Sequence, residues 1–334
     1  MWRECLASLL VLAGAHYFLL RHSKRNDRRN ELPPSEERIV ILGASSVNGI
    51  GAAIARRCMA RGAYNIMLVG RRSDSLREVK MSLIAAQETE EGKARAEQLQ
   101  LFVADCTDEE DVLRLSLAIS QDFGGLDTLY IVFGVICTQS LLALENMDPV
   151  MGAKTIDPTL QGLLTISETT RQSNAANISG TALVLAALIP YLQTKSKRPY
   201  VAVIGSLAAL VPAPTRALYC ASKAAQQMLV QSVAAECASQ ARIAGRNLVR
   251  FVVLAPSTVA TSFSTRMTVG PKNTRSRSLK KMLSPESVGN TVVECVDRNK
   301  TGVVPMPYKY FLVWLLAPLL PGLVERGAHR RYEY

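Results

Sequence analysis

Features typical of disulfide-stabilised, zinc-binding and nucleic-acid-binding proteins are missing from this sequence. Its seven cysteines form no CxxC pair and no short-range framework, a pattern that indicates reduced thiols in a reducing compartment. We predict no metal site. The net charge is +11, but no zinc-finger or RNA-binding signature accompanies it, so nucleic acid is the least favoured partner. A membrane surface or a phosphorylated ligand would account for the charge as well.

Disorder is also excluded, because 48% of the residues are apolar and 20% are charged. The 334 residues are enough to bury a full core. No internal repeat is present, so the chain is not a repeat array. We therefore expect one large globular domain, or two.

The apolar N-terminus predicts a membrane anchor. Residues 5–20 are uncharged, slightly short of the roughly 20 residues that span a bilayer. The basic cluster at 21–29 follows this run, whereas a cleaved signal peptide carries its positive charge before it. We expect residues 1–20 to be an uncleaved anchor with the next domain on the cytosolic side, and residues 21–37 to be a basic, polar linker. A frayed or interfacial helix is the alternative.

From residue 38 onwards, short apolar runs alternate with helical patterns. This alternation predicts an α/β fold, with a Rossmann-like doubly wound parallel sheet and helices on both faces, over residues 38–304. An insertion or lid is expected near 141–174, and an apolar tail at 305–334. The predicted strands are 38–42, 65–70, 99–104, 126–133, 200–204, 249–254 and 302–304. Helical patterns cover 52–61, 73–91, 175–195, 215–242 and 285–298, with a charged turn at 88–96 and a helix cap at Thr107.

A glycine-rich turn joins the first predicted strand to the first helical run. Such a turn presents backbone N–H groups and a helix N-terminus to a phosphate, and glycine is needed where a side chain would block the approach. In this context the turn predicts dinucleotide binding. The candidate residues are Gly43, Ser45, Ser46, Gly49, Ile50 and Gly51.

The second predicted strand ends in Arg71 and Arg72, with no Asp or Glu. An acid there would accept a hydrogen bond from the 2′-OH of NAD, whereas arginine suits the 2′-phosphate of NADP. The sequence therefore favours NADP(H) over NAD(H), and a solvated arginine pair is the alternative. Asp105, after the third strand, is a candidate partner for the adenine amine or a plain loop carboxylate.

Tyr219 and Lys223 lie four residues apart at the start of a long helical pattern, shortly after Ser206 ends the fifth strand. Positions four apart share a helix face, so the phenol and the ammonium can point into one cleft. A cation beside a phenol lowers its pKa from about 10 and makes it a proton donor near neutral pH. A second Tyr-xxx-Lys, Tyr191 to Lys195, has no serine-terminated strand at the right distance before it and is predicted to be structural.

Together with the segment Asn177-Ile178-Ser179-Gly180, these residues resemble the short-chain dehydrogenase/reductase family over about residues 38–304. The resemblance implies a carbonyl reductase, in which a hydride passes from the cofactor to a carbonyl carbon while hydroxyl donors face the oxygen. It implies that Tyr219 is the acid/base, that Lys223 binds the nicotinamide ribose, that Ser206 bonds the substrate carbonyl, and that Asn177 holds the water of a proton relay. Gly134, Pro256, Val259 and Thr261 are implied at the cofactor.

Three departures from the family pattern stand out. Five residues, 44–48, lie between the first two glycines where the family has three, so the loop is expected to bulge. The family's Asn-Asn-Ala-Gly is replaced by the segment 131–134, and its Pro-Gly by Pro256-Ser257. A catalytically weak cofactor-binding scaffold or regulator of the same fold is therefore the alternative function.

The layout is similar to that of the family's membrane-anchored type, which reduces steroids, retinoids or long-chain 3-keto lipids. We accordingly expect a hydrophobic, lipid or steroid-like substrate and a location in a membrane, the endoplasmic reticulum, with the catalytic domain facing the cytosol. The resemblance also implies a homo-oligomer that pairs through the tyrosine-bearing helix and the one before it.

Overall fold

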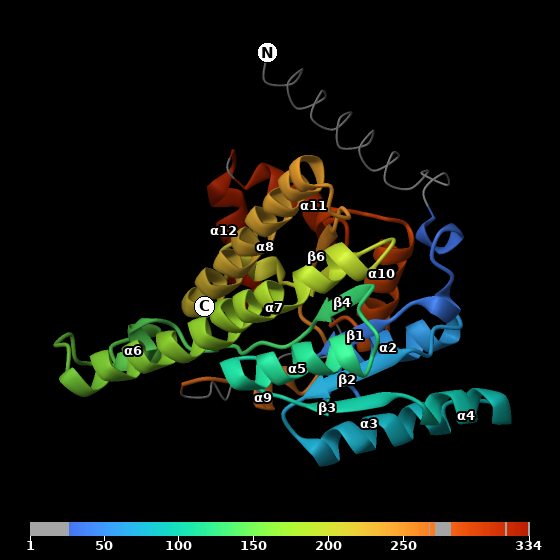
Figure 1. Cartoon of the computed structure of the whole chain (residues 1–334). Coiled ribbons are helices and arrows are strands. Elements are labelled where there is room, and N and C mark those ends of the chain that lie inside the picture. The colour runs from blue at the N-terminus through green and yellow to red at the C-terminus, as the bar shows by residue number, and fades with distance from the viewer. Residues whose placement is uncertain (1–26, 267, 271–281, 318, 333–334) are drawn as a thin grey trace.

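The computed structural model describes residues 27–266, 268–270, 282–317 and 319–332. The predicted anchor at 1–20 and residues 21–26 of the predicted linker lie outside these residues. One seven-stranded parallel sheet has the order β3-β2-β1-β4-β5-β6-β7, with helices on both sides (Figure 1). The strands are β1 Ile39–Leu42, β2 Ile66–Gly70, β3 Gln100–Val103, β4 Thr128–Ile131, β5 Tyr200–Ile204, β6 Arg250–Pro256 and β7 Gly302–Met306. The predicted doubly wound sheet is confirmed.

The order of the strands places the ligand-binding edge. β1 pairs with β2 on one side and with β4 on the other, so the chain crosses over the sheet between β3 and β4. At such a switch point the loops after neighbouring strands diverge and leave a crevice beyond the carboxyl ends of the strands. A ligand is therefore expected between the loops after β1 and β4.

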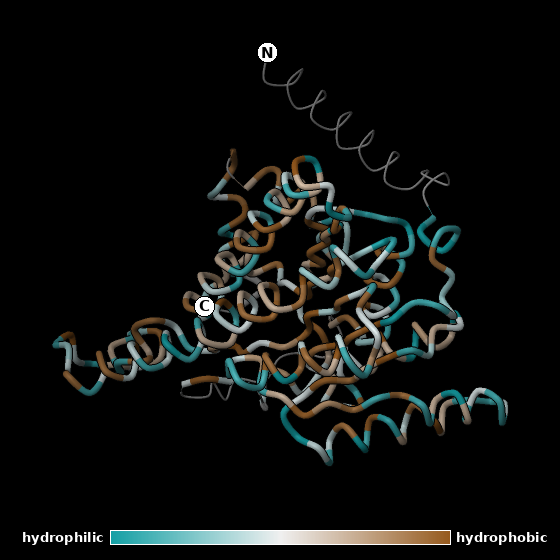
Figure 2. Tube along the Cα trace, in the orientation of Figure 1, coloured by the Kyte–Doolittle hydropathy of each residue, from teal (hydrophilic) through white to brown (hydrophobic). Residues whose placement is uncertain are grey.

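Two hydrophobic cores hold the sheet between its helices. Successive side chains of a strand point to opposite faces: Ile39 and Ile41 enter one core, and Val40 and Leu42 enter the other. Because both faces are covered, the strands read as continuous apolar runs, and the tube through the central strands is coloured hydrophobic (Figure 2). The first core includes α2 Ile50–Ala60, α3 Ser73–Ala85, α4 Glu90–Glu97 and α10 Pro285–Asp297; the second includes α5 Glu109–Gln121, α7 Gly180–Lys195 and α8 Ala217–Ala244.

Two local predictions were wrong. The charged turn expected at 88–96 is instead the helix α4, because the Thr89 side chain accepts a hydrogen bond from Gly92 N and starts a new helical turn. The cap of α5 is Asp108 rather than Thr107, since the Asp108 carboxylate accepts from Asp111 N at 2.9 Å. A carboxylate at this position also suits the positive end of the helix dipole.

The region near 141–174, expected as an insertion or lid, contains more regular structure than predicted. After two 3-10 turns, η4 Leu142–Glu145 and η5 Pro149–Met151, the helix α6 Leu160–Asn174 begins with Thr159 as its cap. It runs through a π-helical turn, η6 Ala175–Ser179, into α7. The helix predicted to begin at 175 therefore starts fifteen residues earlier.

The combined helix Leu160–Lys195 is the one helix among the described residues that is long and apolar enough to cross a membrane. In the structure Val184, Leu188 and Leu192 of this helix are buried in the second core. Packing against the sheet thus accounts for much of its apolar character.

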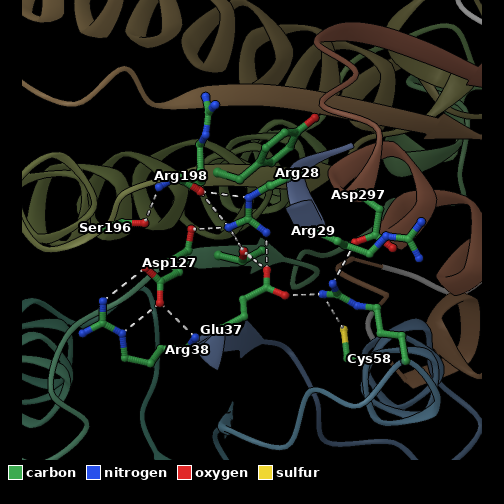
Figure 3. A network of polar contacts seen from close by, with 12 residues as sticks. Arg28, Arg29, Glu37, Arg38, Cys58, Asp127, Ser196, Arg198 and Asp297 are labelled. Atoms are coloured by element: carbon green, nitrogen blue, oxygen red, sulfur yellow. Dashed lines mark hydrogen bonds and ion pairs between the residues drawn. The ribbon is translucent and has the colours of Figure 1, made fainter. Parts of the chain in front are cut away.

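A buried network of charges joins the residues before β1 to the amino-terminal edge of the sheet (Figure 3). Arg28 is 1% exposed; its guanidinium pairs with the fully buried Glu37 and donates to Thr128 Oγ1 at 2.8 Å. Arg61 pairs with the other Glu37 oxygen and, at 2.7 Å, with Asp297. Residues 28–37, predicted as linker, therefore pack against the domain, while the division of the chain into domains stays a prediction.

The remaining described segments follow β6 and β7. They are α9 Phe263–Arg266 after β6, and α11 Tyr310–Leu316 and α12 Pro321–Tyr332 after β7. The apolar tail predicted from the sequence is thus largely helical.

Candidate active site

The predicted catalytic residues come from three elements that meet at the carboxyl edge of the sheet. Ser206 follows β5 and begins the 3-10 turn η7 Leu207–Ala209, which packs against α8. Tyr219 and Lys223 are both buried in the first turns of α8. Asn177 is buried in the π-turn η6, which also packs against α8. The fold therefore brings all four residues to one place.

Lys223 is fixed between two strand ends. Its Nζ donates to the Ile204 carbonyl at the end of β5 at 3.4 Å and to Gln226 Oε1 at 2.8 Å. A Cβ added to Gly134, after β4, would lie 3.4 Å from the same Nζ. Burial disfavours the ammonium and lowers the pKa of Lys223 to about 8. The cation is thus held in a poorly solvated place one helical turn from Tyr219.

Asn177 clamps the loop after β4 to α8. Its Oδ1 accepts from Val135 N at 2.9 Å, and its Nδ2 donates to the Val135 carbonyl at 3.0 Å and to Ser222 Oγ at 2.9 Å. The Ser222 hydroxyl in turn donates to the Tyr219 carbonyl at 3.0 Å. The amide uses both of its N–H groups here, so the side chain positions the loop, while its backbone carbonyl accepts from Thr181 Oγ1.

Ser206 keeps a donor for a ligand. Its Oγ accepts a hydrogen bond from Ala208 N at 3.1 Å. A hydroxyl that accepts one hydrogen bond still carries its own hydrogen. Ser206 is half-buried, so this hydrogen can be directed at a carbonyl oxygen beside α8.

The glycine loop fits a dinucleotide phosphate. Gly43 has φ +94°, and a Cβ there would lie 2.6 Å from Phe133 N, so only glycine is accommodated. Within the lengthened loop, Gly49 N donates to the Ser46 carbonyl at 2.9 Å. Gly49 then begins α2 with no side-chain cap, which leaves the first turn of α2, including Ile50 and Gly51, to present N–H groups to an anion.

The other predicted cofactor residues also lie at strand ends. Ser45 Oγ lies over Gly70, where a Cβ would approach it to 1.9 Å, and so faces the end of β2. Arg71 follows Gly70 in the chain and is half exposed. Its Nη1 lies 3.5 Å from Asp105 Oδ2. Asp105 Oδ1 accepts from both Thr107 N and Thr107 Oγ1, and thus also serves as a loop carboxylate.

Beyond β6, the turn after Pro256 is held to the neighbouring segments. Ser257 N donates to the Met306 carbonyl at 2.7 Å, and Thr261 N donates to the Val259 carbonyl at 2.9 Å. Val259 also forms a β-bridge with Leu283. This turn closes the β6 side of the same edge.

The second motif, Tyr191 to Lys195, lies far along α7 from this edge. Tyr191 packs against the second core, and the Lys195 carbonyl, at the last residue of α7, accepts from Arg38 at 2.8 Å. Arg38 precedes β1, so this pair lies at the amino-terminal edge of the sheet. Its predicted structural role agrees with this placement.

Two buried polar residues, Gln226 beside Lys223 and Thr181 beside Gln226, were not predicted from the sequence. Gln226 Nε2 donates to Thr181 Oγ1 at 2.8 Å. A signal was present: Gln226 follows Lys223 by three residues and Tyr219 by seven, which places all three on one helix face. Thr181 similarly follows Asn177 by four.

Comparisons with known proteins agree with this geometry. A family model described as short chain dehydrogenase matches residues 37–270. An uncharacterized oxidoreductase of Staphylococcus epidermidis is 26% identical over 238 residues, which cover 71% of this chain and 87% of that protein.

Two solved structures share the fold. An alcohol dehydrogenase from the archaeon Thermococcus sibiricus, complexed with 5-hydroxy-NADP, has a TM-score of 0.58 and 21% identity, over 82% of this chain and 98% of that chain. A metagenomic short-chain oxidoreductase in complex with NADP has a TM-score of 0.55 and 22% identity, over 81% of this chain and 96% of that chain. Because the family match spans more than half of the sequence, the chain belongs to the short-chain dehydrogenase family of NAD(P)-dependent oxidoreductases.

Proposed function

We propose that this enzyme reduces the carbonyl of a hydrophobic substrate, or oxidises the corresponding alcohol, with Tyr219 as acid/base. The observation that carries the proposal is the buried Lys223, fixed between the ends of β4 and β5 one helical turn from Tyr219. A cation placed there serves both a phenol and a ribose at the same edge. The glycine loop at β1 supplies the matching phosphate cradle.

Each residue has a defined task in this reaction. A bound nicotinamide cofactor supplies the hydride. Ser206 and Tyr219 donate hydrogen bonds to the substrate oxygen, where negative charge develops, and Tyr219 then gives up its proton to that oxygen. The Lys223 ammonium favours the resulting phenolate by its charge. Asn177 holds the loop that carries Gly134 and Val135, and so shapes the wall of the site.

We propose NADP(H) as the preferred cofactor. Arg71 follows β2 at the position where a ribose phosphate would lie, and no acid ends that strand. A guanidinium binds phosphate through paired charged hydrogen bonds. The similar solved structures were obtained with NADP or 5-hydroxy-NADP, which supports this choice. Turnover with NADPH and with NADH, compared in one assay, tests it.

We also propose a lipid or steroid-like substrate met at a membrane, with the endoplasmic reticulum and a cytosolic catalytic domain as the expected setting. The apolar run at 5–20 and the basic residues after it support an anchor. The helix α11 is wholly apolar, yet none of its seven residues is buried. It follows β7, whose last residue pairs with Pro256 at the carboxyl edge. An apolar surface therefore lies at the edge that holds the site.

Self-association through α8 and the α6–α7 helix is part of the proposal. Several apolar side chains of these helices are exposed, including Leu160, Leu163, Leu164 and Met228. Large apolar side chains exposed on a helix are often part of an interaction surface. The resemblance to the family suggests a second copy as the partner.

The first test replaces Tyr219 by phenylalanine. We expect Tyr219→Phe to lower carbonyl reduction by about 10²–10⁴-fold, because a positioned general acid contributes that much. NADPH binding, measured by quenching of its fluorescence, should stay close to wild type. The assay follows NADPH oxidation by detergent-solubilised protein with long-chain and steroid ketones, and with small soluble aldehydes and ketones for comparison.

Tyr191→Phe is the matched control, since it alters the same kind of motif at the other edge of the sheet. It should leave turnover unchanged. Equal turnover by Tyr219→Phe and wild type would refute the assigned acid. Turnover of small soluble carbonyls alone would refute the substrate class, and cofactor binding without any turnover would favour the regulatory scaffold instead.

A further inference from the structure

A continuous chain of hydrogen bonds connects Lys223 to the π-turn of the α6–α7 helix. The Lys223 ammonium donates to Gln226 Oε1 at 2.8 Å. Gln226 Nε2 donates to Thr181 Oγ1 at 2.8 Å, and the Thr181 hydroxyl donates to the Asn177 carbonyl at 2.9 Å. Every donor in this chain meets an acceptor, and the direction of each bond follows from the chemistry of the groups.

We propose that Gln226 is a positioning residue for Lys223: its amide, oriented by Thr181, accepts a hydrogen bond from the ammonium and holds it between the ends of β4 and β5. The inference deepens the proposed function and rests on the catalytic role of Lys223 given there. Gln226 is 1% exposed and Thr181 is fully buried, so water does not readily replace either partner.

The amide is suited to this task because Lys223 forms no ion pair with any residue that the structure describes. Ile204 offers a backbone carbonyl at the longer distance of 3.4 Å, and Gly134 lends no side chain. On the helix itself, the titratable neighbour is Tyr219, one turn back. Burial alone lowers the pKa of Lys223. An acceptor fixed at 2.8 Å opposes that effect, since hydrogen bonds to a charged group favour the charged form.

The same chain of bonds holds a charge rather than carrying protons. To pass a proton, the Gln226 amide would have to accept one at Oε1 and release another from Nε2, which requires the imidic acid form. A side-chain amide has fixed donor and acceptor ends, unlike a hydroxyl or water. Gln226 and Thr181 therefore act on the site by fixing Lys223.

Gln226→Met tests the inference, because methionine has a similar volume but its thioether sulfur is only a weak hydrogen-bond acceptor. In protein labelled with ¹³C at the lysine ε-carbon, the Lys223 signal is assigned by its loss in Lys223→Met. We expect Gln226→Met to lower the pKa of this signal by about one pH unit. The alkaline limb of the kcat/KM profile should move down with it, since a neutral Lys223 no longer supports Tyr219.

Three further variants complete the design. Gln226→Glu restores an acceptor with a negative charge, so the pKa of Lys223 should rise above the wild-type value and the alkaline limb should return. Thr181→Val frees the Gln226 amide to turn and should lower the pKa of Lys223 by less than Gln226→Met does. Gln193→Met changes another buried glutamine, on α7, whose Nε2 bonds Gln240 instead, and should leave Lys223 unaffected. Thermal unfolding of each variant identifies any that has lost its fold.

An unchanged pKa of Lys223 in folded Gln226→Met overturns the inference. A fall in the pKa of Lys223 in Gln193→Met as large as that in Gln226→Met overturns it too. The titration needs neither substrate nor turnover. If wild-type protein turned over no carbonyl while Gln226→Met still shifted Lys223, the proposed function would fail and the positioning role would stand. If Tyr219→Phe were inactive while Gln226→Met matched wild type in both the Lys223 titration and the kcat/KM profile, the proposed function would stand and the positioning role would fail.

Discussion

At the scale of single residues, Glu37 shows how strongly the interior of this protein depends on paired charge. Its carboxylate is fully buried before β1 and pairs with both Arg28 and Arg61. Burial raises the pKa of Glu37, but the two guanidiniums and the Thr128 hydroxyl together lower it by more than burial raises it. The pKa of Glu37 therefore lies below its ordinary value. The segment before β1 is thereby tied to α2 and β4 (Figure 3).

We expect Glu37→Gln to reduce the free energy of unfolding by about 3–5 kcal/mol, because it leaves two buried guanidiniums without their shared countercharge. Urea unfolding at neutral pH measures this loss. A carboxyl with a depressed pKa contributes stability above its unfolded pKa and loses it as the pH falls through the folded value. The difference between wild type and Glu37→Gln should therefore shrink in acid.

The exposed pair Glu294 and Arg298 offers the control. Both side chains are nearly half exposed, and such pairs contribute about 0–1 kcal/mol. Glu294→Gln should thus leave urea unfolding almost unchanged. A Glu37→Gln protein as stable as wild type at neutral pH would show that the buried charges carry no net attraction.

At the scale of elements, the apolar pattern predicted all seven strands but not all of the helices. The five inner strands are buried on both faces, so each appears as an apolar run bounded by turn residues, and the partly exposed edge strands β3 and β7 are still mostly apolar. The helix α4 buries only Gly92 and Ala96, and α6 buries only Gly162, Thr169 and Ser173. Small and polar contacts of this kind leave no hydrophobic periodicity to detect. Glycine usually disfavours a helix, yet Gly162 lies inside the first turn of α6, where an added Cβ would lie 2.1 Å from Glu145 Cγ.

Some of the residues at the candidate site could likewise be predicted from the sequence, and others could not. That Ser206, Tyr219 and Lys223 lie on elements that pack together could be predicted, because a strand end and a helix face fix their relation along the chain. Gln226 and Thr181 were missed because a buried polar residue is recognised only when its partner on another helix is known. The contact between Gly134 and Asn177 likewise joins residues 43 positions apart, and no local pattern reports it.

That contact gives a test at the scale of elements. A Cβ on Gly134 would lie 2.7 Å from Asn177 Oδ1, so Gly134→Ala must displace the amide that clamps the loop after β4 to α8. We expect turnover to fall by about 10²-fold, since small displacements of a positioned group have effects of that size. Stability should fall by only about 1–3 kcal/mol. Kinetics with NADPH and urea unfolding measure the two effects.

Gly322→Ala is the control, because a Cβ at Gly322 in α12 meets no atom within 4 Å. It should change neither readout. If Gly134→Ala retained wild-type turnover, the close packing of the β4 loop on Asn177 would not matter for the site.

At the scale of the whole molecule, apolar surface and positive charge occur together on the β7 side. Within the described residues, α11 presents Leu312 and Trp314 among side chains that are exposed or half-buried, and Leu319 and Leu323 follow. Lys309 and Arg326 are exposed beside them. Aromatic and aliphatic side chains flanked by cations are typical of a segment that lies in the interface of an anionic membrane. A hydrophobic substrate would then reach the carboxyl edge of the sheet directly from lipid.

The two tryptophans, Trp2 and Trp314, allow this arrangement to be tested in the full chain. With Trp2→Phe, Trp314 becomes the sole tryptophan. We expect its emission to shift to shorter wavelength when vesicles of neutral and anionic phospholipid are added, and to be quenched by lipids brominated on their acyl chains, as for a helix that enters the apolar boundary of the membrane. High salt should weaken the effect by screening the cations.

A tryptophan on a distant helix separates this contact from mere tethering by the N-terminus. Met81 is exposed on α3, which packs against β2 and β3, and β3 and β7 are the two edge strands of the sheet. In a protein with Trp2→Phe, Trp314→Phe and Met81→Trp, emission should not respond to vesicles. If the N-terminus alone held the enzyme to lipid, Trp314 would be as indifferent to brominated lipid as the tryptophan at 81. Quenching of Trp314 alone would place the substrate edge of the sheet at the membrane surface.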